Sequence, residues 1–378
     1  MYLSYNGKKT ESEIKNSIKP ITLKHIEGNP DSGSMLIKGD NLRVMKYLIE
    51  EHGLKNSIDL VYIDPPFSTK NVFTIDSDKA NTISRSANGT IAYDDNLSDE
   101  EYLEFLRSRL LLIKDLMSDR ASIYLHIDYK IGHYVKIIMD EVFGRENYLS
   151  TLTRIKCNPK NFSRKSYGNI KDMILFYSRN KNKHIWNEPR RPLTEEDILR
   201  LFPKIDKDGR RYTTIPLHAP GETQDGATGQ PWRDMLPPKG RHWRTSPEVL
   251  EELDKNGLIE WSKNNVPRKK IYPSDSKGML VQDVLEYKDP QYPLYPTEKN
   301  LELLKMIIRA SSDENSVVFD CFCGSGTALK AARDLGRKWI GIDESEEAIK
   351  ACLKKLSDTQ LDLFNKNMDF AYYEQQNI

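Results

Sequence analysis

The chain has 378 residues, and its 57 lysines and arginines nearly balance its 56 aspartates and glutamates, which gives a formal net charge of +1. Charged residues make up 30% of the chain, no apolar run approaches the roughly 18 residues of a membrane span, and the first residues lack the apolar core of a signal peptide. These features speak against a membrane protein. We expect a cytoplasmic protein with one large α/β domain and an insertion, or with two domains.

The small total charge hides a basic middle segment. Residues 151–290 contain 27 lysines and arginines against 19 acidic residues, a net charge of +8, whereas the rest of the chain carries −7. A basic segment in an otherwise acidic chain indicates a surface that faces a polyanion. A solvated, lysine-rich surface is the alternative that composition leaves open.

The four cysteines give no sign of a metal site. Cys321 and Cys323 form one C-x-C pair, but Cys157 and Cys352 stand alone, so no second pair completes a zinc-binding pattern. We therefore expect reduced thiols and no metal.

Two apolar runs near the N-terminus predict the first buried strands. Residues 1–33 are polar and are expected to form an arm, after which 35–37 predict a short strand, followed by a turn and a helix. Residues 60–63 predict a fully buried strand that ends at Asp64-Pro65-Pro66-Phe67. Neither proline can donate to a continuing strand ladder, so the strand must stop there. Residues 68–96 are polar and predict a long loop.

Strands and helices alternate up to about residue 179. Ser98 and Glu101 have the spacing of a capping box, which predicts the start of a helix that runs to Met117. The next predicted elements are a buried strand at 121–128, a helix at 129–143 that ends at Gly144, and two strands at 147–155 and 172–178 that could pair antiparallel. His126 and Asp128 end the first of these strands, where a role in a pocket and simple strand-end packing are both open.

The composition and periodicity of the chain change at about residue 180. Residues 180–290 are rich in Pro, Arg, Lys, Gly and Trp and show only short periodic pieces, which predicts a loop-rich insertion. Strands and helices then resume, so the α/β body consists of two halves that are distant in sequence. The predicted division is an N-terminal arm at 1–33, a first half at 34–179, the insertion at 180–290, and a second half with a C-terminal tail at 291–378.

The second half contains a glycine turn with the features of a nucleotide-type site. An apolar strand at 317–319 leads into Gly324-Ser325-Gly326 and then a helix, and Asp343 follows at the end of the next strand. The glycines allow a ligand close to the backbone, and an acid at that strand end can accept from ribose hydroxyls. A tight turn that only packs helix on strand is the alternative.

Together, "DPPF" after a strand and "FDCFCGSGT" before a helix resemble the catalytic and S-adenosylmethionine-binding motifs of DNA amino-methyltransferases. Their order, with a long insertion between them, is similar to the β group of that family. The segments "GDNL", "YPTEKNLELL", "GRHWR" and "VPRKKIYPSDSKG" also resemble modification subunits of type III restriction systems, although this chain is shorter. The resemblance covers about residues 34–355. It implies a Rossmann-like, circularly permuted methyltransferase fold with a mostly parallel sheet, in which 180–290 is a target-recognition domain.

The resemblance implies that Asp64, Pro65, Pro66 and Phe67 are catalytic. An exocyclic amine is a poor nucleophile because its lone pair is delocalised into the base. Asp64 and the Pro65 carbonyl can accept its two N–H groups and favour a tetrahedral nitrogen. Phe67 can stack on the base, which must leave the duplex to be reached.

The resemblance also implies binding residues for the cofactor and for DNA. Around S-adenosylmethionine these are Asp40 near the adenine, for which helix capping is equally open, Asp343 at the ribose, and Thr297, Lys299, Asp320, Phe322, Gly324, Gly326 and Thr327. In the insertion, the candidates for phosphates, base edges or stacking are Arg190, Arg191, Arg241, Trp243, Arg244, Arg268, Lys269 and Lys270. For each of these, an ordinary surface charge or a core aromatic is the alternative.

The acid at position 64 favours adenine as the target, because family members with D/N-P-P-Y/F mostly methylate adenine N6, whereas serine at the first position accompanies cytosine N4. The expected activity is methylation of adenine N6 in double-stranded DNA, within a restriction-modification system. Cytosine-N4 methylation, an RNA substrate, and a DNA-recognition subunit that positions a nuclease are the alternatives. A restriction subunit and a second copy of the chain are the protein partners implied.

Overall fold

The computed structural model describes residues 2–66, 72–76, 79–80, 90–94, 98–159, 163, 165–223, 225–290, 298–357 and 368–378. Phe67, Thr297 and most of the predicted loop at 68–96 lie outside the described residues. By its internal contacts the chain forms two compact units, Met1–Pro189 with Gln282–Ile378 (unit 1) and Arg190–Val281 (unit 2). No helix among the described residues is both long enough and apolar enough to cross a membrane.

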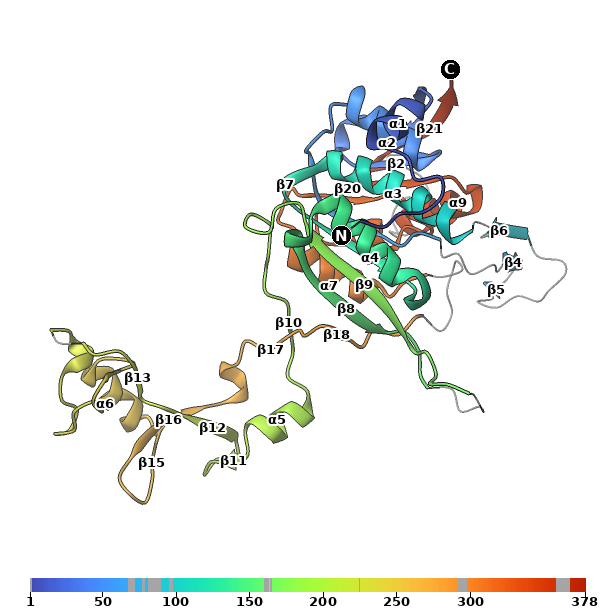
Figure 1. Cartoon of the computed structure of the whole chain (residues 1–378). Helices are drawn as coiled ribbons and strands as arrows, with labels where there is room; N and C mark the ends of the chain where they lie inside the picture. The colour runs from blue at the N-terminus through green and yellow to red at the C-terminus, as the bar shows by residue number, and fades with distance from the viewer. Residues whose placement is uncertain are drawn as a thin grey trace. The chain divides into compact units, whose positions relative to one another are not determined.

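Unit 1 is built on a ten-stranded sheet with the order β1-β21-β2-β20-β19-β3-β7-β9-β8-β18 (Figure 1). The strands are β1 (Ile21–Gly28), β2 (Met35–Lys38), β3 (Ile58–Ile63), β7 (Met117–Ile127), β8 (Tyr148–Ile155), β9 (Lys171–Ser178), β18 (Val284–Leu285), β19 (Val317–Asp320), β20 (Lys338–Asp343) and β21 (Ala371–Asn377). Every pairing from β21 through to β7 is parallel, whereas β1 with β21, β7 with β9, and β9 with β8 are antiparallel. The α/β class with a mostly parallel sheet is confirmed, as is the antiparallel pair β8 and β9.

The two halves of the body interleave in this sheet. β20 pairs with β2, and β19 pairs with β3, although hundreds of residues separate the partners along the chain. Leu60 and Val61 of β3 lie opposite Val318 and Phe319 of β19. The sheet therefore places the end of the Asp64 strand beside the start of the glycine turn.

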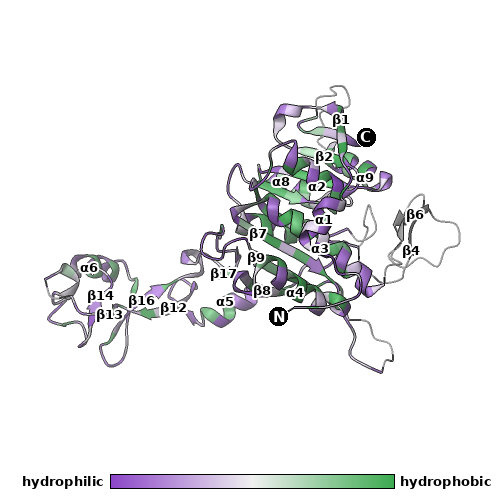
Figure 2. Ribbon diagram, turned by 45° about the horizontal axis from the view of Figure 1, so that its top comes forward, coloured by the Kyte–Doolittle hydropathy of each residue, from purple (hydrophilic) through white to green (hydrophobic). Residues whose placement is uncertain are grey.

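Two groups of helices cover the sheet: α1 (Glu11–Ser17), α2 (Asn41–Glu50), α3 (Asp99–Leu116) and α4 (Tyr129–Phe143) in one, and α7 (Leu301–Ser311), α8 (Thr327–Asp334) and α9 (Glu346–Ser357) in the other. Strand alternation divides the core between them. Val61 and Ile123 belong to the core with α2 to α4, whereas Tyr124 points to α7, where its hydroxyl lies 2.7 Å from Ser311 Oγ. Figure 2 shows the hydrophobic residues gathered on the central strands and on the inner helix faces.

Two segments have more secondary structure than the sequence predicts. Residues 1–33, predicted as a polar arm, contain α1 and β1, and β1 extends the sheet by pairing with β21. Ile14, Ile18 and Ile21 are buried. Even a few apolar residues can be buried here, because α1 contacts α3 and β1 pairs with β21 at the edge of the sheet. Within the predicted loop, β4 (Val72–Asp76), β5 (Lys79–Ala80) and β6 (Thr90–Asp94) form a small sheet.

Unit 2 lies within the range predicted for the insertion. Its elements are β10 (Arg190–Arg191), α5 (Glu195–Leu201), β11 (Lys204–Ile205), β12 (Arg211–Pro216), β13 (His218–Pro220), β14 (Arg241–Trp243), α6 (Pro247–Lys255), β15 (Ile259–Trp261), β16 (Pro267–Ile271) and β17 (Met279–Leu280). The strands form an antiparallel sheet β11-β12-β16-β15 and two small pairs. A core of Leu217, Trp232, Trp243, Leu250 and Ile259 gives the unit its own apolar centre.

Candidate active site

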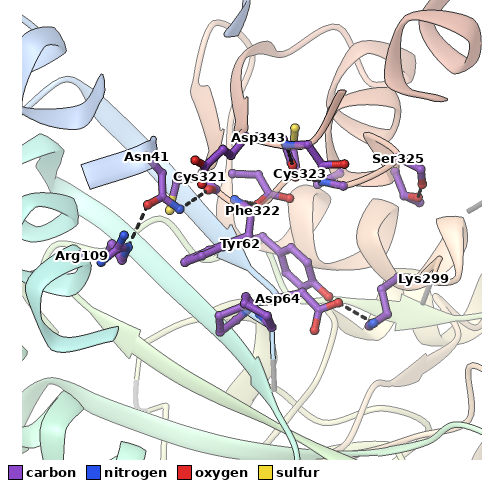
Figure 3. Close-up of a pocket in the computed structure, with 18 of the residues that line it drawn as sticks. Asn41, Tyr62, Asp64, Arg109, Lys299, Cys321, Phe322, Cys323, Ser325 and Asp343 are labelled. Carbon is purple, nitrogen blue, oxygen red and sulfur yellow. Dashed lines mark hydrogen bonds and ion pairs between the residues drawn. The ribbon is translucent and has the colours of Figure 1, made fainter. Parts of the chain in front are cut away.

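A cavity of about 400 Å³ lies at the carboxyl edge of the parallel strands of unit 1 (Figure 3). Its wall combines the end of β3, the turn after β19, the end of β20 and residues from α3 and from the segment before α7. The predicted site residues that line it are Asp64, Pro65, Pro66, Lys299, Asp320, Phe322, Gly324, Thr327 and Asp343. The structure thus brings the two motifs together, as expected where neighbouring parallel strands end at one edge.

One carboxylate oxygen of Asp64 has an interaction partner, and the other has none in the part of the chain that the structure describes. Its Oδ2 forms an ion pair with Lys299 Nζ, drawn as a dashed line in Figure 3. Its Oδ1 is buried and has no hydrogen-bond partner. A buried acceptor without a donor costs about 1–3 kcal/mol, so this oxygen marks a place where an N–H donor of a ligand would be favoured. Lys299, expected at the cofactor, lies in the same cavity but contacts the carboxylate of the other motif.

Asp343 fixes the glycine turn. The backbone N–H of Gly324 donates to its Oδ2 at 2.8 Å, and that of Ser345 donates to its Oδ1 at 2.9 Å. Burial raises the pKa of Asp343 even though both amides donate to it. Each carboxylate oxygen keeps a second lone pair, which leaves Asp343 able to accept from a hydroxyl in the cavity.

Asp320 is the most deeply buried carboxyl group of the cavity wall, at 3% exposure. Its Oδ1 accepts from the backbone N–H of Phe322 at 3.0 Å. Burial, with additional repulsion from Asp64 and Asp343, raises the pKa of Asp320 well above its usual range. Five acids (Asp64, Glu298, Asp320, Asp343 and Glu344) and two cations (Arg109 and Lys299) line the cavity, and this excess of acids favours a ligand that carries positive charge.

The thiols of the turn are poor nucleophiles. Cys321 and Cys323 are buried, and their surroundings raise both thiol pKa values well above the usual range, mainly through burial at Cys321 and through a hydrogen bond with Cys352 at Cys323. Thiols in this state stay protonated near neutral pH. Among the described residues, no group of three or more His, Cys, Asp or Glu side chains has metal-binding geometry.

Arg109 of α3 is a site residue that the sequence interpretation missed. Its Nε donates to Asn41 Oδ1 at 2.8 Å, and Asn41 Nδ2 donates to the Cys321 carbonyl at 2.8 Å (Figure 3). The guanidinium also lies 3.6 Å from the centre of the Phe105 ring. An arginine within the apolar stripe of a helix was the available signal. Asp40 accepts from Arg43 N–H as the cap of α2 and, like Gly326, is not part of the cavity wall.

Lys355 is a second missed residue. It is 8% exposed, and its Nζ donates to Glu298 at 2.6 Å, to Ser325 Oγ at 2.8 Å and to Thr327 Oγ1 at 2.9 Å. It thereby ties the segment that carries Lys299 to the glycine turn. A lysine among the buried positions of α9 could have indicated this role.

In unit 2, the candidate DNA residues fall into two environments. Trp243 is 3% exposed and belongs to the core, which corresponds to the core-aromatic alternative. The basic candidates contact protein groups: Arg190 the Gly278 carbonyl, Arg191 Asp197, Arg241 His218, Arg244 the Pro216 carbonyl, Arg268 Thr214, and Lys270 the Tyr212 ring. Lys269 and Lys270 also line a cleft of about 890 Å³ together with Arg210, Arg211 and Tyr272.

Comparison with known proteins identifies relatives of the chain. Residues 58–354 match the DNA methylase family model of N6 and N4 methyltransferases. The chain is 38% identical over 367 residues to the type II methyltransferase M.EcaI of Enterobacter cloacae, covering 94% of this chain and 77% of the relative. It is 24% identical to the Mod subunit of the type III restriction-modification enzyme EcoP15I of Escherichia coli, covering 82% of this chain and 58% of the relative.

Among solved structures, the M1.HpyAVI-SAM complex matches with 16% identity and a TM-score of 0.45, covering 85% of this chain and all of that one. The cytosine-N4-specific PvuII DNA methyltransferase matches with 13% identity and a TM-score of 0.49, covering 87% and 88%.

Packing at the glycine turn can be tested by Gly326→Ala. Gly326 has a φ of +74°, and an added Cβ would lie 2.4 Å from Cys352 Sγ. The substitution should cost about 1–2 kcal/mol for the left-handed backbone plus the cost of this contact, measured by chemical unfolding. Gly336→Ala is the matched control, because Gly336 has a φ of +69° and open space around it. Equal losses for the two variants would contradict tight packing of the turn on α9.

Proposed function

We propose that this chain, which belongs to the DNA methylase family of N6 and N4 methyltransferases, methylates N6 of adenine in a short sequence of double-stranded DNA. It is an S-adenosylmethionine-dependent DNA methyltransferase of the restriction-modification type. The finer assignment to adenine is supported by the acid at position 64 in the D-P-P-F motif. The observation that carries the proposal is the buried, unpartnered Asp64 Oδ1 in a cavity shared with the glycine turn.

The proposed reaction requires the protein to activate a weak nucleophile, the exocyclic amine of the base. S-adenosylmethionine supplies an electrophilic methyl group on a positively charged sulfur. Asp64 Oδ1 would accept one N–H of the amine and the Pro65 carbonyl the other, which concentrates the lone pair on nitrogen and orients it toward the methyl carbon. Lys299 would hold the Asp64 carboxylate through Oδ2 while Oδ1 accepts from the amine. Phe67 would stack on the flipped base.

The cavity wall suits the cofactor in charge and in shape. We assign Asp343 to the ribose and Asp320, Phe322, Gly324 and Thr327 to the methionine part. Carboxylates in the wall, including Asp320 and Asp343 when they are ionised, favour a cationic sulfonium over its neutral product, so binding and release of the cofactor would be driven partly by charge. Gly326 acts indirectly by shaping the turn, and Asp40 by capping α2.

We assign unit 2 to target recognition. The support is its basic cleft, in which Arg210, Arg211, Lys269 and Lys270 surround Tyr272, and a cluster of cations in a groove suits the phosphates of one DNA strand. Arg190, Arg191, Arg241, Arg244 and Arg268 are further candidates for contacts with DNA. A restriction subunit and a second copy of the chain are the protein partners that we propose, because several relatives are Mod subunits.

The reaction is tested by incubating the protein with radiolabelled S-adenosylmethionine and mixed-sequence duplex DNA, followed by digestion to nucleosides. We expect N6-methyladenine as the labelled product. Asp64→Ala should lower transfer at least about 10³-fold while cofactor affinity stays within a few fold, because the carboxylate acts on the base. Asp119→Ala, at an exposed acid paired with Lys183, is the control and should change neither.

The other outcomes of this experiment discriminate among the alternatives. Labelled N4-methylcytosine would replace adenine as the target, and preferential labelling of RNA in competition would replace DNA. No methylated base from protein with bound cofactor would overturn the proposal.

Cofactor affinity should depend on pH through Asp320. Because burial raises the pKa of Asp320, it is protonated over a wider range than an exposed aspartate, and its negative charge appears only as pH rises through that raised pKa. The affinity for the cationic cofactor should therefore increase with pH, measured by calorimetric titration between pH 5 and 9. Asp320→Asn should remove most of this dependence, and the neutral thioether product should show less of it. Equal pH dependence in wild type and Asp320→Asn would contradict the assignment.

The basic cleft is tested by salt dependence. Lys269→Ala and Lys270→Ala should each weaken duplex binding by a similar factor for all sequences and reduce the slope of log K against log salt by about 1. Lys263→Ala, an exposed lysine of the β15–β16 hairpin that does not line the cleft, is the matched control and should have a smaller effect. A slope that is unchanged in both cleft variants would exclude phosphate contacts there.

A further inference from the structure

A buried chain of hydrogen bonds leads away from the wall of the active-site cavity. Tyr62 of β3 lines the cavity and is 2% exposed, and its hydroxyl lies 2.9 Å from His126 Nδ1 of β7. His126 is fully buried, and its Nε2 lies 3.2 Å from Asp172 Oδ2 of β9. Three neighbouring strands therefore hold one tyrosine, one histidine and one aspartate in a row.

Asp172 determines where the protons of this row lie. Burial alone would raise the pKa of Asp172, but hydrogen bonds from His126 and from Lys156, whose Nζ is 2.6 Å from Oδ1, hold that pKa well below its usual range. When His126 is neutral, a charged Asp172 favours the tautomer that donates its Nε2–H to the carboxylate. Nδ1 then has a lone pair, so the Tyr62 hydroxyl donates to it.

Tyr62 stands next to the group that is proposed to hold the target amine. Residues two apart in an extended chain point to the same side, so Tyr62 and Asp64 both face the cavity, as Figure 3 shows. Burial and the charge of Asp64 raise the pKa of Tyr62 well above its usual range. The hydroxyl is therefore neutral, and it can receive a proton only while it passes its own to His126.

We propose that Tyr62, His126 and Asp172 remove the proton that the target amine loses on methylation, an inference that rests on the proposed function. As the N–C bond forms and the C–S bond breaks, the bonding pair of the C–S bond stays on sulfur, and the nitrogen carries a methyl group, two hydrogens and a positive charge. One of these protons moves to the Tyr62 oxygen while the Tyr62 proton moves to His126 Nδ1. The nitrogen becomes neutral, and an imidazolium is left beside Asp172.

The charges around the site favour this acceptor over Asp64. A proton on Asp64 would weaken its ion pair with Lys299 in the cavity, whereas a proton on His126 gains the charge of Asp172. The other charged groups near the row are Arg154 of β8, Lys156 directly after β8, Asp289, which pairs with Arg154, and Asp320, which faces Tyr62. These two cations and the two acids Asp172 and Asp289 balance, so a protonated His126 adds one positive charge at a site whose nearest charged partner is negative. Lys156 and Asp289 are 26% and 46% exposed, which gives this side of the row access to water.

The test is the rate of methyl transfer in a single turnover, measured between pH 6 and 9 with the full chain, S-adenosylmethionine and duplex DNA. Tyr62→Phe should lower the rate constant by about 100-fold and make it rise with pH over the whole range, because water or hydroxide must take the proton. Cofactor and DNA affinity should stay within about threefold. His126→Asn should have a similar effect, and the double variant should be no slower than the slower single variant, since the residues act as one unit.

Tyr124→Phe is the matched control. Tyr124 is also a buried tyrosine of the central strands, 2% exposed with its hydroxyl on Ser311, but it does not line the cavity, so its loss should leave the pH profile unchanged. A Tyr62→Phe rate within twofold of wild type at every pH, or no lower than that of Tyr124→Phe, would overturn the inference while leaving the proposed function in place. Absence of a methylated amine from the wild-type enzyme would instead overturn the proposed function.

Discussion

The parallel pairing of β3 with β19 is the constraint on which the rest of unit 1 depends. It joins residues 60–61 to residues 318–319, and both strands then end within a few residues, at the same edge of the sheet. Proline follows one strand and glycine the other, so neither continues, and their side chains and backbone amides face a common space. A circularly permuted order of the motifs does not prevent such a site, because strand pairing in the sheet, and not the order along the chain, determines which strand ends are neighbours.

The acids at this edge of the sheet repel one another, and three features of the fold reduce that repulsion. Lys299 pairs with Asp64, the backbone amides of Phe322, Gly324 and Ser345 donate to the other two acids, and the raised pKa values of Asp320 and Asp343 favour their neutral forms. A cation bound among these acids would reduce the repulsion further. A cationic ligand would therefore stabilise the site more than a neutral one of the same shape, which agrees with the chemistry of a sulfonium cofactor.

The parts of this site that could be predicted from the sequence are those encoded locally. A strand followed by "DPPF", a strand followed by "FDCFCGSGT", and the Ser98 capping box each occupy consecutive residues, and the structure has all three strands or helices where they were expected. Arg109 and Lys355 were not predicted, because each acts on residues that are far away in the sequence and lies in a helix whose pattern only indicates burial. Trp243 shows the same difficulty in reverse, since composition cannot tell a core aromatic from an exposed one.

The charge asymmetry of the sequence has a counterpart in two cavities of opposite character. Five acids and two cations line the cavity of unit 1, whereas four basic side chains and one acid line the cleft of unit 2. Each lies within a unit that has its own apolar core, so the acids of one cavity and the cations of the other need not share one site. Under the proposed function a single cavity could not bind both ligands, because cations that attract phosphates would also repel a sulfonium and would compete for the carboxylate that is proposed to accept from the amine. If unit 2 binds DNA as proposed, the separation into two units lets the same chain attract an anionic polymer and a cationic methyl donor.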